Sequence, residues 1–250
     1  LIRSLMRERT EYRELSVPRD AQGQRQLLRS LMNVRPPSEI STEFLVVQND
    51  YLRQELAEDG ITRAEDLRPA KDGLCLWQGN ITRLRCGAIV NAANSGMTGC
   101  YIPCHACIDN FIHTYAGVQL RLECADLMTA QGHEEPAGQA KITRAYNLPC
   151  DYVLHTVGPI VEGSVTKENE RLLASCYRSC LELAEQYGIR SIAFCCISTG
   201  VFRFPNERAA EIAVDTVRRY KSETGSQIKV IFNVFKDTDK MIYERLLGRA

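Results

Sequence analysis

The chain has 250 residues, of which 44% are apolar and 25% are charged, so it can form an ordinary globular protein with one sizeable hydrophobic core. Its 31 basic and 31 acidic residues cancel to a formal charge of zero. No long-range field therefore draws the chain to a phosphate backbone or an anionic membrane, and neither nucleic acid nor a membrane is expected as a partner.

The absence of a recognisable targeting signal and the cysteine pattern both indicate a cytosolic protein. No apolar run approaches the ~20 residues that span a bilayer, and the amino-terminal stretch LIRSLMRERTEYREL is too charged for a signal peptide. The 11 cysteines are odd in number and show no disulfide framework. We therefore expect reduced thiols and a cytoplasmic location.

Residues 1–70 are predicted to form an amino-terminal helical extension without strands. Leucines and a methionine recur at helical spacing over residues 21–32, and Pro36-Pro37 ends that helix. Ser38 or Ser41 would cap a second helix that runs to about Leu56. Its expected inner face consists of Phe44, Leu45, Val47, Tyr51, Leu52 and Leu56. The extension either pads the main domain or covers the mouth of a site.

Residues 71–250 alternate between short β-rich runs and amphipathic helices. Strands are predicted at 74–78, 88–92, 140–146, 152–157, 192–197 and 228–235, and helices at 108–128 (with a weak point at Gly117), 168–187, 205–220 and 237–247. This alternation predicts an α/β domain with a mostly parallel sheet covered on both faces. Ligands of such sheets bind beyond the carboxyl ends of the strands.

Three segments that follow strands are expected to converge on that edge of the sheet: residues 78–82, 91–107 and 196–202. The last contains Ser198-Thr199-Gly200 and leads into a helix, so its backbone N–H groups and the helix N-terminus favour an anion such as a diphosphate. No GKS, GKT or GxGxxG sequence is present, which disfavours ATP hydrolysis and nicotinamide chemistry.

The segment 91–107 carries a cluster of metal-binding residue types. Cys100, Cys104, His105 and Cys107 fall within eight residues, and thiolates with an imidazole are the ligands that zinc prefers. Cys100, His105 and Cys107 form the favoured set, which leaves the fourth position open, as in catalytic sites. Two alternatives stay open from the residues alone: Cys104 could replace Cys100, or these cysteines could be small apolar packing residues.

Four motifs in order give the chain a resemblance to a known family. They are QGNIT (78–82), IVNAAN (89–94), GQAKITRAYNLPCDYVLHTVGP (138–159) and ISTGVFRFP (197–205). Together they resemble the macrodomain family of ADP-ribose-binding modules, which implies a three-layer αβα fold with a mixed, mostly parallel central sheet. The Cys-x4-His-x-Cys insertion after NAAN resembles the zinc-dependent branch, microbial enzymes that remove mono-ADP-ribose from proteins.

The resemblance implies a role for each matching residue. The adenosine end would be contacted by Asn80, where the family commonly has aspartate, by the backbone of Ile81 and by Asn233. Asn94 would approach the distal ribose and act in catalysis with the Zn²⁺ ligands Cys100, His105 and Cys107. The phosphates would be lined by Tyr101, Ile102, Ser198, Thr199, Gly200, Val201 and Phe202.

The remaining titratable residues near the cluster are given structural roles. Asp109 lies just inside a predicted helix start and is interpreted as a residue that stabilises the helix dipole rather than as a base. His113, one turn into that helix, is left out of the ligand set. His155 is interpreted as a structural strand residue and His133 as an exposed loop residue.

The function that the resemblance implies is zinc-dependent hydrolysis of mono-ADP-ribose from modified Asp or Glu side chains. A lipoyl-carrier protein is the implied substrate, and a sirtuin-type ADP-ribosyltransferase is the implied partner acting on the same target. Two alternatives use the same pocket: deacetylation of O-acetyl-ADP-ribose, and non-catalytic binding of ADP-ribose by a reader module.

Overall fold

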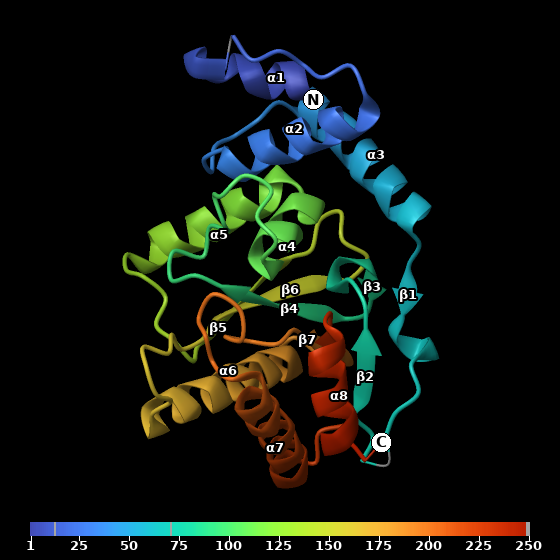
Figure 1. Ribbon diagram of the computed structural model, residues 1–250, viewed down its shortest axis with the longest axis vertical. Helices are drawn as coiled ribbons and strands as arrows, with labels where there is room; N and C mark the ends of the chain where they lie inside the picture. Colours follow the sequence, from blue (N-terminus) through green and yellow to red (C-terminus); the bar gives the residue numbers. More distant parts are fainter. Residues whose placement is uncertain (13, 71, 249–250) are drawn as a thin grey trace.

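Helices form most of the amino-terminal part of the computed structural model, which describes residues 1–12, 14–70 and 72–248 (Figure 1). They are α1 (Ile2–Arg7), η1 (Thr10–Tyr12), α2 (Ala21–Val34) and α3 (Thr42–Asp59). α2 begins where the Asp20 carboxylate accepts the N–H of Gly23 at 2.7 Å. α3 begins where the Ser41 hydroxyl accepts the N–H of Phe44 at 3.2 Å, so Ser41 and not Ser38 is the cap.

These helices pack on the rest of the chain through a small apolar cluster. Leu28, Leu31 and Phe44 are buried there against Val118 of the main body. The prediction that Val47 faces inward is wrong, because Val47 is 54% exposed. The buried face of α3 follows Phe44, Gln48 and Leu52 instead.

A short strand lies in the region that was predicted to contain none. β1 (Thr62–Arg63) pairs in parallel with β3 (Leu84–Arg85), and η2 (Ala64–Asp66) follows it. Two residues are too few to leave an alternating apolar pattern, which is why the sequence gives no sign of this strand.

The main sheet has six strands and one antiparallel edge. In spatial order they are β2 (Cys75–Gln78), β8 (Lys229–Val234), β7 (Ser191–Phe194), β4 (Ala88–Ala93), β6 (Tyr152–Val157) and β5 (Ala140–Arg144). Every neighbouring pair is parallel except β5 with β6. β7 ends three residues earlier than predicted: its pairing with β8 stops at Phe194, although Cys195 and Ile197 beyond it are still buried.

Helices cover both faces of this sheet, as Figure 1 shows. α4 (Ile108–Ala116) and α5 (Val118–Gln131) lie between the sheet and the amino-terminal helices, whereas α6 (Lys167–Gln186), α7 (Asn206–Thr224) and α8 (Asp237–Leu246) lie on the opposite face. The predicted three-layer αβα fold with a mixed, mostly parallel sheet is confirmed. None of the described helices combines the length and the apolar character that a membrane span requires.

The predicted helix over 108–128 is two helices, which meet at Gly117. Gly117 has φ +98°, and an added Cβ would lie 2.6 Å from Gln48 Nε2 of α3. The Gln48 side-chain oxygen accepts the N–H of Val118 at 3.0 Å, so α3 occupies the break between α4 and α5.

Candidate functional site

The carboxyl ends of the parallel strands bring the predicted site segments to one edge of the sheet. Asn80 follows β2, Asn94 follows β4, the loop 196–204 follows β7, and Phe235 follows β8. The ladder between β4 and β7 covers only Ala88–Ile89 and Ile192–Ala193, whereas β4 pairs with β6 as far as Ala93. The segments that follow β4 and β7 therefore leave the sheet at the position where α/β folds bind ligands.

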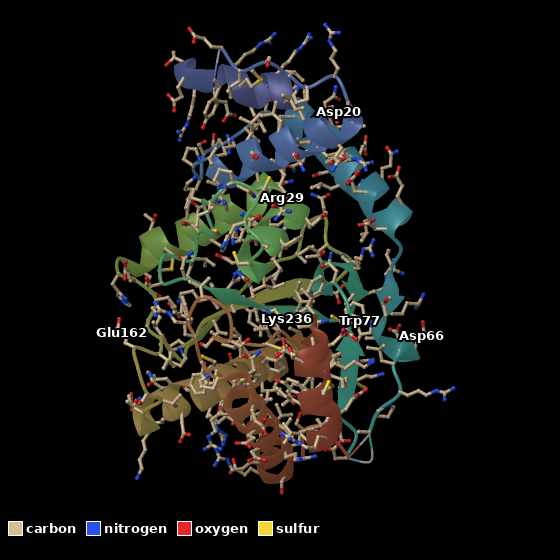
Figure 2. All side chains as sticks on the ribbon, viewed as in Figure 1. Asp20, Arg29, Asp66, Trp77, Glu162 and Lys236 are labelled. Carbon is tan, nitrogen blue, oxygen red and sulfur yellow. The ribbon has the colours of Figure 1, made fainter. Side chains whose placement is uncertain are left out.

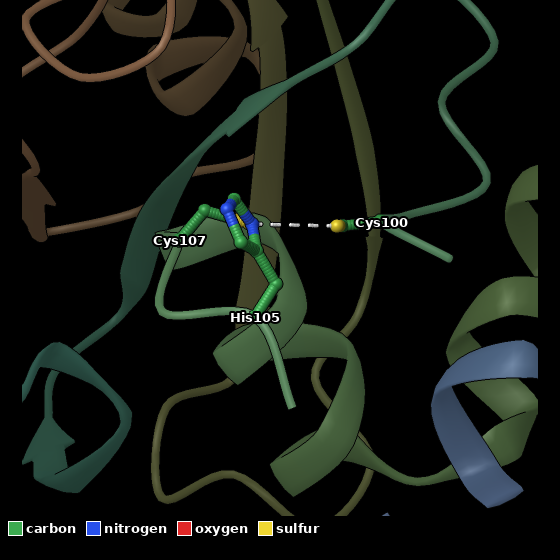
Figure 3. Close-up of side chains that lie close together, drawn as sticks. All are labelled: Cys100, His105 and Cys107. Carbon is green, nitrogen blue, oxygen red and sulfur yellow. Dashed lines mark hydrogen bonds between the residues drawn. The ribbon is translucent and has the colours of Figure 1, made fainter. Parts of the chain in front are cut away.

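Cys100, His105 and Cys107 lie together in the loop between β4 and α4 (Figure 3). Their ligand atoms all lie within 4.8 Å of one another, and Cys100 Sγ is 3.6 Å from His105 Nδ1. All three residues are half-buried. Burial is the main reason that the pKa of the Cys107 thiol is raised, to about 12. Two sulfurs and an imidazole nitrogen in this arrangement are a donor set that fits zinc.

Cys104 points away from this group. Its Sγ lies 3.2 Å from Ser30 Oγ and 3.5 Å from the carbonyl oxygen of Gln26, both on α2. Adjacent side chains of the loop thus face opposite sides, and Cys104 does not share the space between Cys100, His105 and Cys107.

A second group of His and Cys side chains is fully buried beneath the loop. His113, Cys124 and His155 have ligand atoms within 4.8 Å of one another. The ring nitrogens of His155 already lie 3.2 Å from Asn91 Nδ2 and 2.9 Å from Thr143 Oγ1. Burial lowers the pKa of His155 to about 3, so it is a neutral residue of β6, as its interpretation as a structural residue requires. His113 belongs to this buried group and not to the loop.

Asn94 and Asp109 form a polar pair beside the loop. Asn94 Nδ2 donates to Asp109 Oδ2 at 3.3 Å and to the carbonyl of Gly99 at 3.1 Å. Its Oδ1 accepts the N–H of Gly96 at 3.0 Å. Asp109 is 5% exposed and also accepts from Asn91 Nδ2 at 2.8 Å. Burial raises the pKa of Asp109 to about 6, and the bond from Asn91 opposes that rise.

The interpretation of Asp109 as a residue of the helix start missed its contacts. Asp109 is the second residue of α4, as expected, but its carboxylate faces inward and holds Asn94. Its place two residues after Cys107 is the sequence signal that could have included it in the site.

The loop after β7 contains two non-glycine residues with positive φ. Ser198 has φ +65° and Arg203 has φ +58°, and the N–H of Phe204 donates to the carbonyl of Ser198 at 3.0 Å. Ser198 is 5% exposed and its hydroxyl has no hydrogen-bond partner among the described residues. An unpaired buried donor is costly, so this hydroxyl is suited to a ligand oxygen.

The other predicted residues of this loop lie around Ser198. Thr199 Oγ1 donates to the carbonyl of Cys196 at 3.0 Å, which fixes its side chain within the turn. Val201 is 68% exposed, and nothing lies within 4 Å of a Cβ built on Gly200. Phe202 is half-buried, and its carbonyl accepts the N–H of Val161 at 2.9 Å.

The ends of β2 and β8 lie at the same edge of the sheet, beside the loop after β7. Asn80 Oδ1 accepts the N–H and O–H of Thr82 at 3.1 and 2.8 Å. The side chain of Ile81 is buried, so its backbone is what can face a ligand. Asn233 Nδ2 donates to the carbonyl of Gly79 at 2.9 Å and holds the end of β2. Phe235, which sequence reasoning missed, is 76% exposed directly after β8.

Tyr101 and Ile102 are exposed on the loop that follows β4. Tyr101 is 41% exposed and Ile102 is 57% exposed. The guanidinium carbon of Arg121 lies 4.2 Å from the centre of the Tyr101 ring. Tyr101 is therefore held on one face and open to solvent on the other.

Comparison with known proteins places the chain in a family. A model described as "Macro domain" matches residues 90–213. A protein-ADP-ribose hydrolase from Treponema medium is 56% identical over 252 residues, which cover 99% of this chain and 97% of that protein. The chain belongs to the macro domain family.

Other macro domain proteins agree over most of the chain. A protein-ADP-ribose hydrolase from Staphylococcus aureus (strain MSSA476) is 50% identical, covering 100% of this chain and 94% of its own length. The Trypanosoma brucei macrodomain, solved in complex with ADP-ribose, matches with a TM-score of 0.68 at 31% identity and covers 88% of this chain and 95% of its own. The resemblance of the four sequence motifs to macrodomains is thereby confirmed.

Proposed function

We propose that this macro domain protein is a hydrolase that removes mono-ADP-ribose from modified protein side chains and that it uses Zn²⁺. The observation that carries the proposal is the meeting of Cys100, His105 and Cys107 on the loop that follows Asn94. Relatives that bear the name of this activity align with nearly the whole chain, including its amino-terminal extension.

The loop 198–204 would bind the diphosphate of ADP-ribose. The Ser198 hydroxyl, which has no partner among the described residues, and the backbone N–H groups of Gly200 and Val201 would donate to the phosphate oxygens. The N-terminus of α7 adds a favourable dipole. Adenosine would then lie toward Asn80, Asn233 and Phe235, where the exposed aromatic ring offers a stacking surface. Tyr101 and Ile102 would cover the phosphates from the opposite side.

Zn²⁺ would be held by Cys100 Sγ, the His105 imidazole and Cys107 Sγ. Three protein ligands would leave a coordination position for an oxygen ligand, and the bound ion would supply stabilisation of negative charge that develops on oxygen. The two thiolates would neutralise the ion, so orientation of the substrate is expected to matter as much as polarisation.

Asn94 would orient the distal ribose. Its amide is fixed by donation to Asp109 and Gly99 and by acceptance from Gly96, which leaves one lone pair of Oδ1 for a ribose hydroxyl. Asp109 acts through Asn94: its buried carboxylate holds the amide nitrogen, while the amide oxygen faces the N–H of Gly96. The chain would thus present the anomeric carbon next to the proposed metal ligands in a fixed orientation.

The chemistry of the leaving group favours substrates that are modified on Asp or Glu. A departing carboxylate is stable without a proton, so cleavage of its bond to the anomeric carbon needs no strong general acid. Asp109 is an acid next to the loop, and its hydrogen bonds to two amides give it a positioning role. A lipoyl-carrier protein in the cytoplasm, modified by a sirtuin-type ADP-ribosyltransferase, is the substrate that we propose.

The test is release of ADP-ribose from a carrier protein modified on glutamate, with zinc-loaded protein. His105→Ala should abolish release, whereas His133→Ala, the same exchange at an exposed loop histidine, should leave it unchanged. O-acetyl-ADP-ribose is assayed in parallel: faster hydrolysis of that ester would make the protein a deacetylase. Binding of ADP-ribose without turnover of either substrate would make it a reader.

A further inference from the structure

The loop that carries Cys100, His105 and Cys107 contains a strained turn. Cys104 has φ +52°, a left-handed conformation that non-glycine residues rarely adopt. The turn is supported from outside the loop, because the N–H of Cys104 donates to Asn33 Oδ1 at 2.9 Å. Asn33 lies near the end of α2, in the amino-terminal extension.

Asn33 joins the turn to α4, the helix that follows Cys107. It is 1% exposed, and its Nδ2 donates to Thr114 Oγ1 at 2.9 Å. Thr114 Oγ1 in turn donates to the carbonyl of Asn110 at 2.7 Å, in the first turn of α4. The single buried side chain of Asn33 thus fixes the position of Cys104 relative to α4. His105 lies in the sequence between Cys104 and the start of α4.

Arg29 of α2 provides a second attachment. Its Nη2 donates to the carbonyl of His105 at 2.9 Å and to Asn110 Oδ1 at 2.8 Å. Its guanidinium carbon lies 4.2 Å from the centre of the Phe111 ring, and Figure 2 shows Arg29 between α2 and α4. The backbone of His105 is therefore held by α2 and α4 together.

Arg121 of α5 links the other end of the loop to α2. Its Nη1 donates to the carbonyls of Asn33 and Arg35 at 2.6 and 2.5 Å, and its Nη2 donates to the carbonyl of Cys100 at 3.4 Å. The same guanidinium supports the Tyr101 ring. The end of α2 thus fixes Arg121, and Arg121 holds the segment at Cys100.

We infer that α2 of the amino-terminal extension is an integral part of the metal site and that Asn33 is the positioning residue that brings His105 to Cys100 and Cys107. This inference rests on the proposed zinc site, and it gives the extension a role beyond padding the main body. Partners outside the ligand shell typically change metal affinity by about 10- to 100-fold when they are removed.

The test compares Asn33→Ala with a matched control from the same extension. Gln48 of α3 is 0% exposed and also joins the extension to the body, through Val118 and Gln119, but none of its hydrogen bonds reaches the loop. Each full-length variant is freed of metal, and its zinc affinity is measured by competition with a chromogenic chelator. Asn33→Ala should bind zinc about tenfold or more weakly. Gln48→Ala should bind zinc as tightly as the wild type, although its melting temperature should fall about as far as that of Asn33→Ala.

Two further measurements separate positioning from general stability. Asn33→Asp keeps the acceptor for the N–H of Cys104 and should restore most of the zinc affinity even if the melting temperature stays low. Amide hydrogen exchange of the metal-free protein should be faster at Cys104 in Asn33→Ala than in Gln48→Ala.

The outcomes distinguish this inference from the proposed function. Equal zinc affinity in Asn33→Ala and Gln48→Ala, or equal exchange at Cys104, would overturn the role of Asn33. If the wild type itself binds no zinc but Cys104 exchange still depends on Asn33, the proposed metal fails while the structural link stands. If Asn33→Ala does not fold, Asn33→Asp is compared with Arg29→Ala, which removes the bond to the His105 carbonyl and should bind zinc more weakly. Equal zinc affinity in these two variants would overturn the role of α2 in the metal site.

Discussion

Gly158 lies against Ser198 of the loop that we propose to bind the diphosphate, and its replacement by alanine should displace that loop. A Cβ on Gly158 would lie 2.0 Å from Ser198 Oγ and 2.8 Å from Ile197 Cγ2. Since ordinary contact begins at 3.4 Å, the Ser198 hydroxyl has to withdraw by about 1.4 Å. Rotation of the hydroxyl alone leaves the contact with Ile197.

The cost of the Gly158→Ala variant should appear in both stability and binding. Overpacking of a close contact typically costs about 1–3 kcal/mol of unfolding free energy. The loop cannot yield easily, because Ser198 is already in the left-handed region and its carbonyl is bonded to the N–H of Phe204. Loss of a hydrogen bond to a charged phosphate is worth about 1.5–3 kcal/mol, which corresponds to roughly 10- to 100-fold weaker binding of ADP-ribose.

Urea denaturation and isothermal titration calorimetry with ADP-ribose measure the two effects. Gly200→Ala is the stability control within the same loop, because a Cβ there meets nothing within 4 Å and its φ is not in the positive range. Adding Ser198→Ala to Gly158→Ala removes the closest clash and should recover part of the stability without recovering the affinity. A Gly158→Ala variant with the wild-type denaturation midpoint and the wild-type Kd would refute this placement of the phosphate loop.

Three further predictions concern other parts of the site and the core. Burial lowers the pKa of His155 to about 3, so below pH 6.5 the unfolded chain binds a proton that the folded chain rejects. The contribution of His155 to the free energy of unfolding is complete above pH 6.5 and should fall by about 1.4 kcal/mol per pH unit below it, down to pH 3. In His155→Gln, the free energy of unfolding from urea denaturation should therefore change less between pH 7 and pH 5.5 than in the wild type. An equal change in both proteins would contradict the assignment. Cys100→Ser should lower the bound zinc, measured by elemental analysis, from about one ion per chain to near zero, whereas Cys104→Ser should retain it; equal loss would make Cys104 a ligand. Phe235→Ala should weaken ADP-ribose binding about tenfold, which is the value of one aromatic stacking contact. Tyr187→Ala, which removes an exposed aromatic ring at the end of α6, should leave the Kd unchanged. An unchanged Kd for Phe235→Ala would remove Phe235 from the adenosine end.

The fold could be predicted from the sequence because its signals are local. Alternating strands and amphipathic helices are visible in windows of 5 to 20 residues, and their order implies the parallel sheet. The errors occur where a tertiary contact decides the outcome. The predicted helix over 108–128 divides at Gly117 because Gln48, far away in the sequence, occupies the break. β1 is recognised only through its pairing with β3.

The candidate site could be predicted only in part, for the same reason. Cys100, His105 and Cys107 are close in the sequence, so their spacing alone suggests that they meet. Asn33 reads as an ordinary helix residue, and its contact with the turn at Cys104 spans 71 positions of the chain. Likewise, nothing in the sequence around Asp109 shows that its carboxylate is buried against two amides.

The pairing of β2 with β8 determines when the two ends of the site can form during synthesis of the protein. The segments around the metal loop, from α2 to α4, have all been synthesised once residue 116 leaves the ribosome. Cys75 of β2, in contrast, has no strand partner until Ile231 of β8 has been synthesised. At ribosomal speeds of about 5–20 residues per second, β2 remains without its neighbour for on the order of ten seconds. The nascent chain therefore exposes an unpaired apolar strand beside the proposed adenosine end during this interval.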